Sequence, residues 1–319
     1  MKEFELIHQL QQALTGPGCS AAGVELGIGD DAAVLAVPEG QHLVAATDTL
    51  NEGTHFPTGT PANDIAHKCL AVNLSDLAAM GATPRWALLS LSLPRAEPGW
   101  LQSFIRGFKT LAQEHGIVLV GGDTTSGPLS VCVTALGTVA RGSQLQRNGA
   151  QSGDLLVVSG TIGGAARVLE LLHAGGPDID RQLLDRPRPR VKLGQSLVGF
   201  ASACIDISDG LLADLGHVLK SSGCGARVEL AQLPYADILA DLDDVSKWNC
   251  QLSGGDDYEL LFTLPPRYEP MIAGWQKQLE IELSVIGQIE TQAGIRCVKA
   301  DGGAFDPAGA GFEHFASNS

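Results

Sequence analysis

The chain contains 319 residues, 44% of them hydrophobic and 18% charged, which suffices for two folded domains and argues against global disorder. Its formal net charge of -15 argues against a nucleic-acid-binding surface, because phosphate neutralisation requires clustered lysine and arginine. The seven cysteines form no CxxC pair, no apolar run approaches membrane-spanning length, and no signal-peptide pattern opens the chain. We therefore expect a cytoplasmic protein that binds neither nucleic acid nor membranes.

The first half of the chain contains both predicted helices and predicted strands. Three segments have apolar residues at helical spacing and end at glycine or proline: 3–14, 62–81 and 99–115. Five apolar segments are predicted to be strands: 32–37, 43–47, 86–93, 117–122 and 129–139. Pro38, Glu39 and Gly40 separate the first two strands, which predicts a hairpin turn between them.

A domain boundary is expected between residues 141 and 153, because this stretch is polar and has few large apolar residues. It divides the chain into residues 1–145 and 146–319. Both parts mix strands and helices without strict alternation, so we expect an α+β fold with largely antiparallel or mixed sheets.

The second half contains further predicted elements. Strands are predicted at 155–159, from Cys204 and at 260–264, and helices at 163–172 and 211–221. Residues 186–190, with the sequence Arg-Pro-Arg-Pro-Arg, are predicted to form an exposed link into a helix that ends near Phe200.

Residues 27–31 (Gly-Ile-Gly-Asp-Asp) place two adjacent carboxylates, Asp30 and Asp31, directly before a predicted strand. A buried carboxylate without a partner costs several kcal/mol or gives up its charge, so this pair needs water or a cation. A similar Gly-Gly-Asp-Asp sequence at 254–257 precedes the strand at 260–264, which suggests two related lobes.

Four further acids follow predicted strands or lie on a predicted helix: Asp48, Asp76, Asp123 and Asp206. Mg2+ prefers oxygen ligands from a few carboxylates together with phosphates and water. With Asp31, these acids could hold several ions and, through them, a nucleotide polyphosphate. Each acid taken singly is better explained by a solvated turn or a helix cap, and only the joint pattern favours metal binding.

The usual nucleotide-binding fingerprints are absent. No GxxxxGK[ST] sequence occurs, and the glycines of residues 27–31 precede their strand, whereas those of a dinucleotide-binding fold follow one. Residues 159–164 (Ser-Gly-Thr-Ile-Gly-Gly) do lie between a predicted strand and a predicted helix. Their backbone N–H groups could bind an anion, but we favour a tight connecting turn.

Six motifs, in order, resemble the motif series of the thiamine-monophosphate kinase family. They occupy residues 25–32, 47–56, 71–82, 121–124, 206–211 and 253–260. The family belongs to an ATP-binding superfamily with aminoimidazole ribonucleotide synthetase and selenophosphate synthetase. One motif alone is weak, but six in order are specific, and the resemblance extends from about residue 25 to residue 315.

The resemblance implies a two-lobed synthetase-like α+β fold. Its N-terminal lobe, with a mixed or antiparallel sheet, would bind ATP and Mg2+ and form a homodimer. Its C-terminal α/β sandwich lobe would complete the nucleotide and substrate sites. The implied reaction is direct in-line transfer of the γ-phosphate of ATP to thiamine monophosphate, with several Mg2+ ions and no phosphoenzyme.

The resemblance also implies roles for individual residues. The expected Mg2+ ligands are Asp31, Thr47, Asp48, Asp76, Asp123, Asp206 and Asp209, with Asp30 as a weaker candidate. The expected ATP contacts are Gly122, Asp123, Arg147 and Ser208, and the expected substrate contacts are His55, Asp256 and Phe312. No catalytic acid or base is assigned, because a phosphate monoester acceptor is largely dianionic at neutral pH and needs no strong base.

Two positions depart from the family pattern. The family often has Glu where Asp256 stands, so the acid of this chain is shorter by one methylene. It has Tyr or Trp where Phe312 stands. Simpler interpretations also stay open for single residues: His55 as a solvated histidine, Arg147 as part of a linker and Phe312 as a core residue. Lys68 is expected to pair with the helix or with an acid.

Two other functions stay open. A synthetase of the same superfamily, of the selenophosphate or aminoimidazole ribonucleotide type, would also use ATP, although Cys19 only faintly matches the reactive position of the former. A non-catalytic binding protein on the same fold would be expected to lose the metal-binding acids, whereas this sequence retains them at every matched position.

Overall fold

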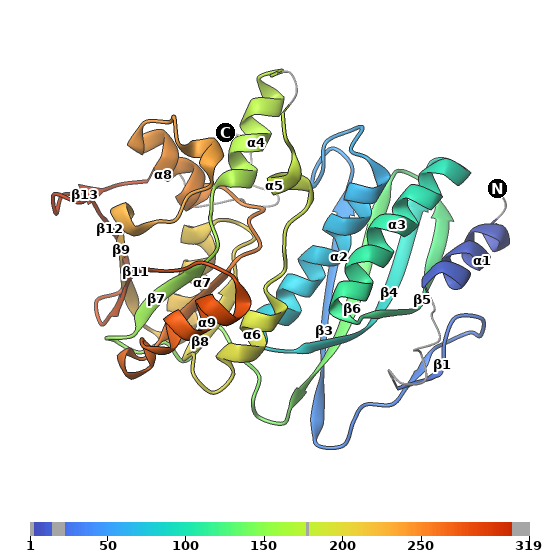
Figure 1. Cartoon of the computed structure of the whole chain (residues 1–319), viewed down its shortest axis with the longest axis horizontal. Coiled ribbons are helices and arrows are strands. Elements are labelled where there is room, and N and C mark those ends of the chain that lie inside the picture. The colour runs from blue at the N-terminus through green and yellow to red at the C-terminus, as the bar shows by residue number, and fades with distance from the viewer. Residues whose placement is uncertain (1–2, 15–22, 177–178, 308–319) are drawn as a thin grey trace. The chain divides into compact units, whose positions relative to one another are not determined.

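The computed structural model describes residues 3–14, 23–176 and 179–307. The chain divides into two compact units, the first formed by Met1–Leu77 and Ala82–Gln144 and the second by Ala78–Gly81 and Leu145–Ser319. Both contain helices and mixed sheets, so the α+β prediction is confirmed (Figure 1).

The first unit contains a four-stranded sheet in the order β3-β6-β4-β5. Its strands are β3 (Gln41–Asn51), β4 (Thr83–Leu93), β5 (Val118–Ser126) and β6 (Ser130–Ala140). β6 is antiparallel to both β3 and β4, whereas β4 and β5 are parallel. The parallel pair is joined through a helix, as parallel neighbours require.

The helices of the first unit are α1 (Glu3–Leu14), α2 (Ala62–Ala79) and α3 (Pro98–His115), close to their predicted bounds. α2 and α3 cover one face of the sheet (Figure 1). The inward face of α3 includes Phe104 and Phe108, which are fully buried. The helix ends at Gly116 with φ 65°, a left-handed conformation that glycine adopts without steric cost.

The second unit contains a seven-stranded sheet in the order β13-β12-β9-β11-β7-β10-β8. Its strands are β7 (Leu155–Ser159), β8 (Ala203–Asp206), β9 (Gly225–Glu229), β10 (Leu260–Leu264), β11 (Leu283–Glu290), β12 (Gly294–Val298) and β13 (Ala304–Phe305). Among the strands described for this sheet, only β9 and β12 pair in parallel. All five residues of β10 are buried, and four of them are apolar, the exception being Thr263.

The helices of the second unit are α4 (Gly164–His173), α5 (Gln182–Asp185), α6 (Val191–Leu197), α7 (Leu211–Ser222), α8 (Asp244–Ser253) and α9 (Met271–Leu279). α7 packs its apolar residues, among them Leu215 and Val218, against the sheet core. α4 packs against α5 and α8 in smaller clusters. Across the described ranges, no helix has both the length and the hydrophobicity needed to cross a membrane.

Three details of the sequence prediction are wrong. No hairpin joins the strands on either side of Pro38: β2 (Val34–Leu35) pairs with β1 (Val24–Leu26), and β3 pairs along its whole length with β6. The ladder with β6 pairs eleven residues of β3, whereas a local hairpin with the two-residue β2 would pair far fewer.

The other two corrections concern Asp123 and the arginine-proline link. Asp123 lies within β5 (Val118–Ser126), whereas the sequence analysis predicted that it would follow the strand. Pro187 and Pro189 are buried, so residues 186–190 are not simply an exposed link.

Gly122 offers a direct test of the β4–β5 pairing. It has φ 151°, and a Cβ at this position would lie 1.8 Å from the backbone oxygen of Leu89. We expect Gly122→Ala to separate the two strands and lower the free energy of unfolding by at least about 2 kcal/mol, measured by urea denaturation. Gly99→Ala in α3 is the control, because a Cβ there meets nothing within 4 Å. An equal loss in both variants would contradict this account.

Candidate functional site

Residues 27–31 form an exposed turn between β1 and β2. The carboxylate of Asp30 accepts a hydrogen bond from the backbone N–H of Asp31 at 2.9 Å, so Asp30 shapes the turn. The side-chain amide of Gln11 on α1 donates to the backbone oxygen of Ile28 at 2.7 Å. The turn is thus anchored to α1, while the carboxylates of Asp30 and Asp31 belong to exposed residues.

Thr47 and Asp48 lie in the middle of β3. The Thr47 hydroxyl is within hydrogen-bonding distance of the Val133 backbone oxygen and the Thr134 hydroxyl on β6, at 3.2 and 2.9 Å. The backbone N–H of Asp48 donates to the side-chain oxygen of Asn73, 3.1 Å away. Asn73 is fully buried on α2, so this bond ties β3 to the helix that carries Asp76.

His55 lies in the loop after β3. Its ring Nδ1 accepts a hydrogen bond from the backbone N–H of Asn51 at 3.0 Å. Because an amide N–H can only donate, Nδ1 is unprotonated and the neutral ring carries its proton on Nε2. Lys68, a buried cation on α2, donates to the backbone oxygen of His55 at 3.0 Å. Lys68 therefore supports the loop that presents His55.

Gly122 and Asp123 lie on β5 beside a cavity of about 90 Å³. The cavity is also lined by Ile28, so the turn at 27–31 and Asp123 border the same space. Asp48 pairs with Val133, which pairs with Leu89, which in turn pairs with Gly122. Three strand spacings therefore separate Asp48 from Gly122, roughly 14 Å. Within the described part of the chain, no three acidic, histidine or cysteine side chains converge as a closed metal cage.

In the second unit, Ser208 and Asp209 form a turn between β8 and α7. The carboxylate of Asp214, in the first turn of α7, accepts hydrogen bonds from the backbone N–H groups of both residues, at 2.9 and 3.0 Å. Asp206, at the end of β8, is also buried. Burial, and next the charge of Asp206, raise the pKa of Asp214 to about 7.

Asp256 belongs to a strained segment before β10. Asp256 has φ 69° and Tyr258 has φ 52°, left-handed values that residues other than glycine rarely adopt. The Tyr258 hydroxyl donates to the Asp256 carboxylate at 3.1 Å. The backbone N–H groups of these two residues donate to the oxygens of Ser208 and Ile207, at 2.9 and 2.8 Å. The segment is therefore bonded to the Ser208 turn.

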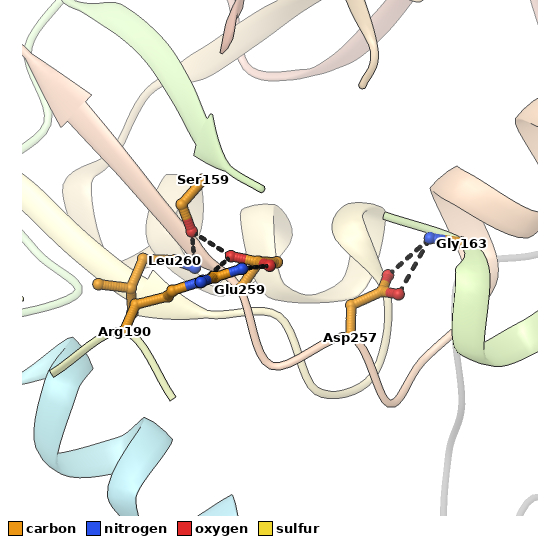
Figure 2. Close-up of polar contacts among 6 residues, drawn as sticks. All are labelled: Ser159, Gly163, Arg190, Asp257, Glu259 and Leu260. Carbon is orange, nitrogen blue, oxygen red and sulfur yellow. Dashed lines mark hydrogen bonds and ion pairs between the residues drawn. The ribbon is translucent and has the colours of Figure 1, made fainter. Parts of the chain in front are cut away.

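Figure 2 shows the carboxylates that anchor this segment. Both oxygens of Asp257 accept from the backbone N–H of Gly163, at 3.0 and 2.9 Å. Desolvation raises the pKa of Asp257 well above its ordinary value, although the N–H groups of Gly163 and Ala165 oppose the shift. The backbone N–H of Gly163, in the turn at 159–164, is therefore already bound by a side chain of the same protein. This agrees with the interpretation of these residues as a connecting turn.

Glu259 forms the second anchor. Its carboxylate accepts from Nε of Arg190 at 2.6 Å, from Nη2 of the same guanidinium, and from the Ser159 hydroxyl at 2.5 Å (Figure 2). Ser159 in turn accepts the backbone N–H of Leu260 at 2.9 Å. Burial raises the pKa of Glu259, and Arg190 opposes that rise. Removing one partner of such a buried pair typically costs about 3–5 kcal/mol.

Two further predicted residues lie elsewhere. Arg147 is exposed, and its neighbour Gln146 accepts the backbone N–H of Cys204 on β8 at 2.8 Å. Arg147 is therefore held next to the strand that ends at Asp206. Phe312 lies outside the described residues.

The sequence analysis overlooked the residues that hold these turns: Asn73, Asp214, Asp257, Tyr258, Glu259 and Arg190. One signal was present for Glu259, because an acid that directly precedes a largely apolar strand should be buried and needs a cation. The arginines at 186–190 were available as candidates. Nothing local singled out Asp214, which resembles an ordinary acid in the first turn of a helix.

Each of the two parts of the chain matches a known protein family. Residues 29–139 match the family described as AIR synthase related protein, N-terminal domain. Residues 151–299 match AIR synthase related protein, C-terminal domain.

Individual relatives cover nearly the whole chain. A thiamine-monophosphate kinase of Haemophilus influenzae is 43% identical over 304 residues, 92% of this chain and 91% of the relative. The crystal structure of thiamine-monophosphate kinase from Stenotrophomonas maltophilia is 44% identical, with a TM-score of 0.86 over 96% of this chain and 98% of that one. The structure described as AaThiL complexed with AMPPCP and TMP is 30% identical, with a TM-score of 0.74 over 97% and 96%.

The raised pKa of Asp214 predicts a pH dependence of stability in metal-free protein. Between pH ~4, the ordinary pKa of an aspartate, and pH about 7, Asp214 keeps its proton in the folded chain but has lost it in the unfolded chain. This contribution is present below the unfolded pKa and is lost as pH rises through the folded pKa. In EDTA, we expect Asp214→Asn to gain stability relative to wild type as pH rises, by at most about 1.4 kcal/mol per pH unit. Urea unfolding at several pH values measures the free energy of unfolding of both proteins. Parallel plots of this free energy against pH would contradict the prediction.

Proposed function

This chain belongs to the thiamine-monophosphate kinase family, and we propose that it phosphorylates thiamine monophosphate to thiamine diphosphate, with ATP as donor and Mg2+ as cofactor. The observation that carries the proposal is the likeness, over nearly the full length, to a kinase structure described as a complex with AMPPCP and TMP. AMPPCP is a non-hydrolysable analogue of ATP, so we infer that it stands for the phosphate donor and TMP for the acceptor.

The acids of the chain suit Mg2+ as the cofactor. The proposed ligands provide oxygen only, and the described part of the first unit spreads them over β3, α2, β5 and the turn at 27–31. Mg2+ commonly takes one or two carboxylates and completes its octahedron with phosphates and water. A dispersed set of carboxylates fits ions that reach full coordination only when the nucleotide is present. When bound, Mg2+ would neutralise charge on the polyphosphate.

We assign the ligands to the two units separately. In the first unit the proposed metal ligands are Asp31, Thr47, Asp48, Asp76 and Asp123, with Asp30 shaping the turn. In the second unit they are Asp206 and Asp209. In the second unit Ser208 and Arg147 would contact ATP. In the first unit Gly122, whose backbone is exposed, and Asp123 are the proposed ATP contacts.

The acceptor contacts follow from chemistry. His55 would donate its Nε2 proton to the phosphate of thiamine monophosphate, because Nδ1 already accepts the N–H of Asn51. Asp256 would bind the cationic or amino-bearing part of the thiamine, and Phe312 would stack on a ring. With a dianionic phosphate as nucleophile, these residues need only align it with the γ-phosphorus and screen repulsion.

Kinase assays with purified protein test this function. With ATP, Mg2+ and thiamine monophosphate, we expect thiamine diphosphate to form and the activity to disappear in EDTA. Asp48→Asn should lower the rate by on the order of a hundredfold, because it removes a charged metal ligand. Asp64→Asn, an acid at the start of α2 outside the proposed ligands, is the control and should retain activity. Equal rates for Asp48→Asn and wild type, or a trapped phosphoenzyme, would refute the mechanism.

We also propose that the chain forms a homodimer through β3. β3 is an edge strand of eleven residues, and within the described residues it pairs only with β6. Its sequence contains no lysine, arginine or proline, which commonly protect such an edge from pairing. Leu43 on this strand is 48% exposed. A second copy of the chain would satisfy this edge and cover Leu43.

Light scattering tests the dimer. We expect wild type to have twice the chain mass and Leu43→Asp to weaken association by at least about tenfold, because a charge would be buried in the interface. Val245→Asp is the control, since Val245 is equally exposed but lies on α8. A wild-type monomer at micromolar concentration would contradict the proposal.

A further inference from the structure

The segment at 256–258 stores backbone strain. Asp256 and Tyr258 are two of the three described residues other than glycine with positive φ. A left-handed conformation costs such a residue about 1–2 kcal/mol, so the surrounding contacts must impose it. Strain of this kind persists only when the surrounding structure imposes it, and it is commonest at functional sites.

Asp257 lies between the two strained residues, and its hydrogen bonds are the main contact that fixes this segment. Both of its oxygens accept the N–H of Gly163, which precedes α4. A carboxylate at the start of a helix also interacts favourably with the helix dipole. Gly163 itself is fixed: its φ is 85°, and a Cβ there would lie 2.9 Å from the backbone of Cys250. Asp257 is therefore attached to a rigid point on α4.

Tyr258 makes the second contact that fixes this segment. Its hydroxyl donates to the Asp256 carboxylate at 3.1 Å. Its left-handed backbone lies between Asp257 and the buried Glu259, which is itself bound by Arg190 and Ser159. The position of the Tyr258 ring, and with it the hydrogen bond to Asp256, depends on both carboxylate anchors.

We propose that Asp257 and Tyr258 are positioning residues for the acceptor substrate, which act by holding the Asp256 carboxylate in the one conformation that binds it. The inference rests on the proposed function, in which Asp256 contacts thiamine monophosphate. Asp257 fixes the backbone through Gly163, and Tyr258 fixes the carboxylate directly. Neither residue touches the substrate.

A purely structural role for Asp257 makes a different prediction. A cap on α4 that served only stability would change the amount of folded protein, and any change in KM would be independent of Asp256. A positioning role acts through Asp256, so its effect must vanish once the Asp256 carboxylate is gone. A double-mutant cycle separates the two roles.

The experiment measures KM for thiamine monophosphate, KM for ATP and kcat in Asp257→Asn, Tyr258→Phe, Asp256→Ala and the two double variants that include Asp256→Ala. We expect Asp257→Asn to raise KM for thiamine monophosphate by about tenfold or more, and Tyr258→Phe by a few-fold, with KM for ATP changed less than about twofold. In each double variant, KM should equal that of Asp256→Ala alone.

Asp185→Asn is the matched control. Asp185 is a buried carboxylate of the second unit that pairs with Arg181 at 2.7 Å, outside the proposed site. It should lower stability and leave both KM values unchanged. If Asp257→Asn does not fold, Tyr258→Phe carries the same test.

The outcomes distinguish this inference from the proposed function. Wild-type protein that makes no thiamine diphosphate would overturn the proposed function. Active wild type with unchanged KM in Tyr258→Phe and Asp257→Asn, or with effects that add to that of Asp256→Ala, would overturn this inference alone.

Discussion

The buried ion pair between Glu259 and Arg190 is the constraint on which the second unit depends. Glu259 immediately precedes β10, whose five residues are all buried between β7 and β8. An unpaired carboxylate at this depth would be costly, and the guanidinium of Arg190 together with the Ser159 hydroxyl satisfies it. The pair joins the residue that precedes α6 to the residue that precedes β10, so it ties this helix to a buried strand of the sheet.

Two other carboxylates use a second device, in which a side chain binds the backbone N–H groups of a turn. Asp214 holds the N–H groups of Ser208 and Asp209, and Asp257 holds that of Gly163. Backbone bonds between Asp256 and Ser208 then join the two turns. The residues proposed to bind nucleotide and acceptor in this unit therefore stand on one hydrogen-bonded framework.

The first unit positions its acids by packing. The Asn73 side chain ties Asp48 to α2, Gln11 ties the turn at 27–31 to α1, and Gly122 lets β5 approach the backbone of β4. Glycine at 122 thus has a structural reason beside the proposed contact with ATP. The acids themselves stay exposed or half-buried.

The sequence by itself determined most helices and strands, the mixed fold and the family, because hydrophobic spacing, glycine stops and ordered motifs are local signals. It missed the partner of β3, since strand pairing over long distances is decided by the ladder that satisfies most backbone groups. Only the tertiary structure decided which acids are anchors and which are available. Asp257 meets Gly163 across 94 positions, and Glu259 meets Arg190 across 69. A carboxylate's role follows from its donors, and here these donors come from distant segments that folding brings together.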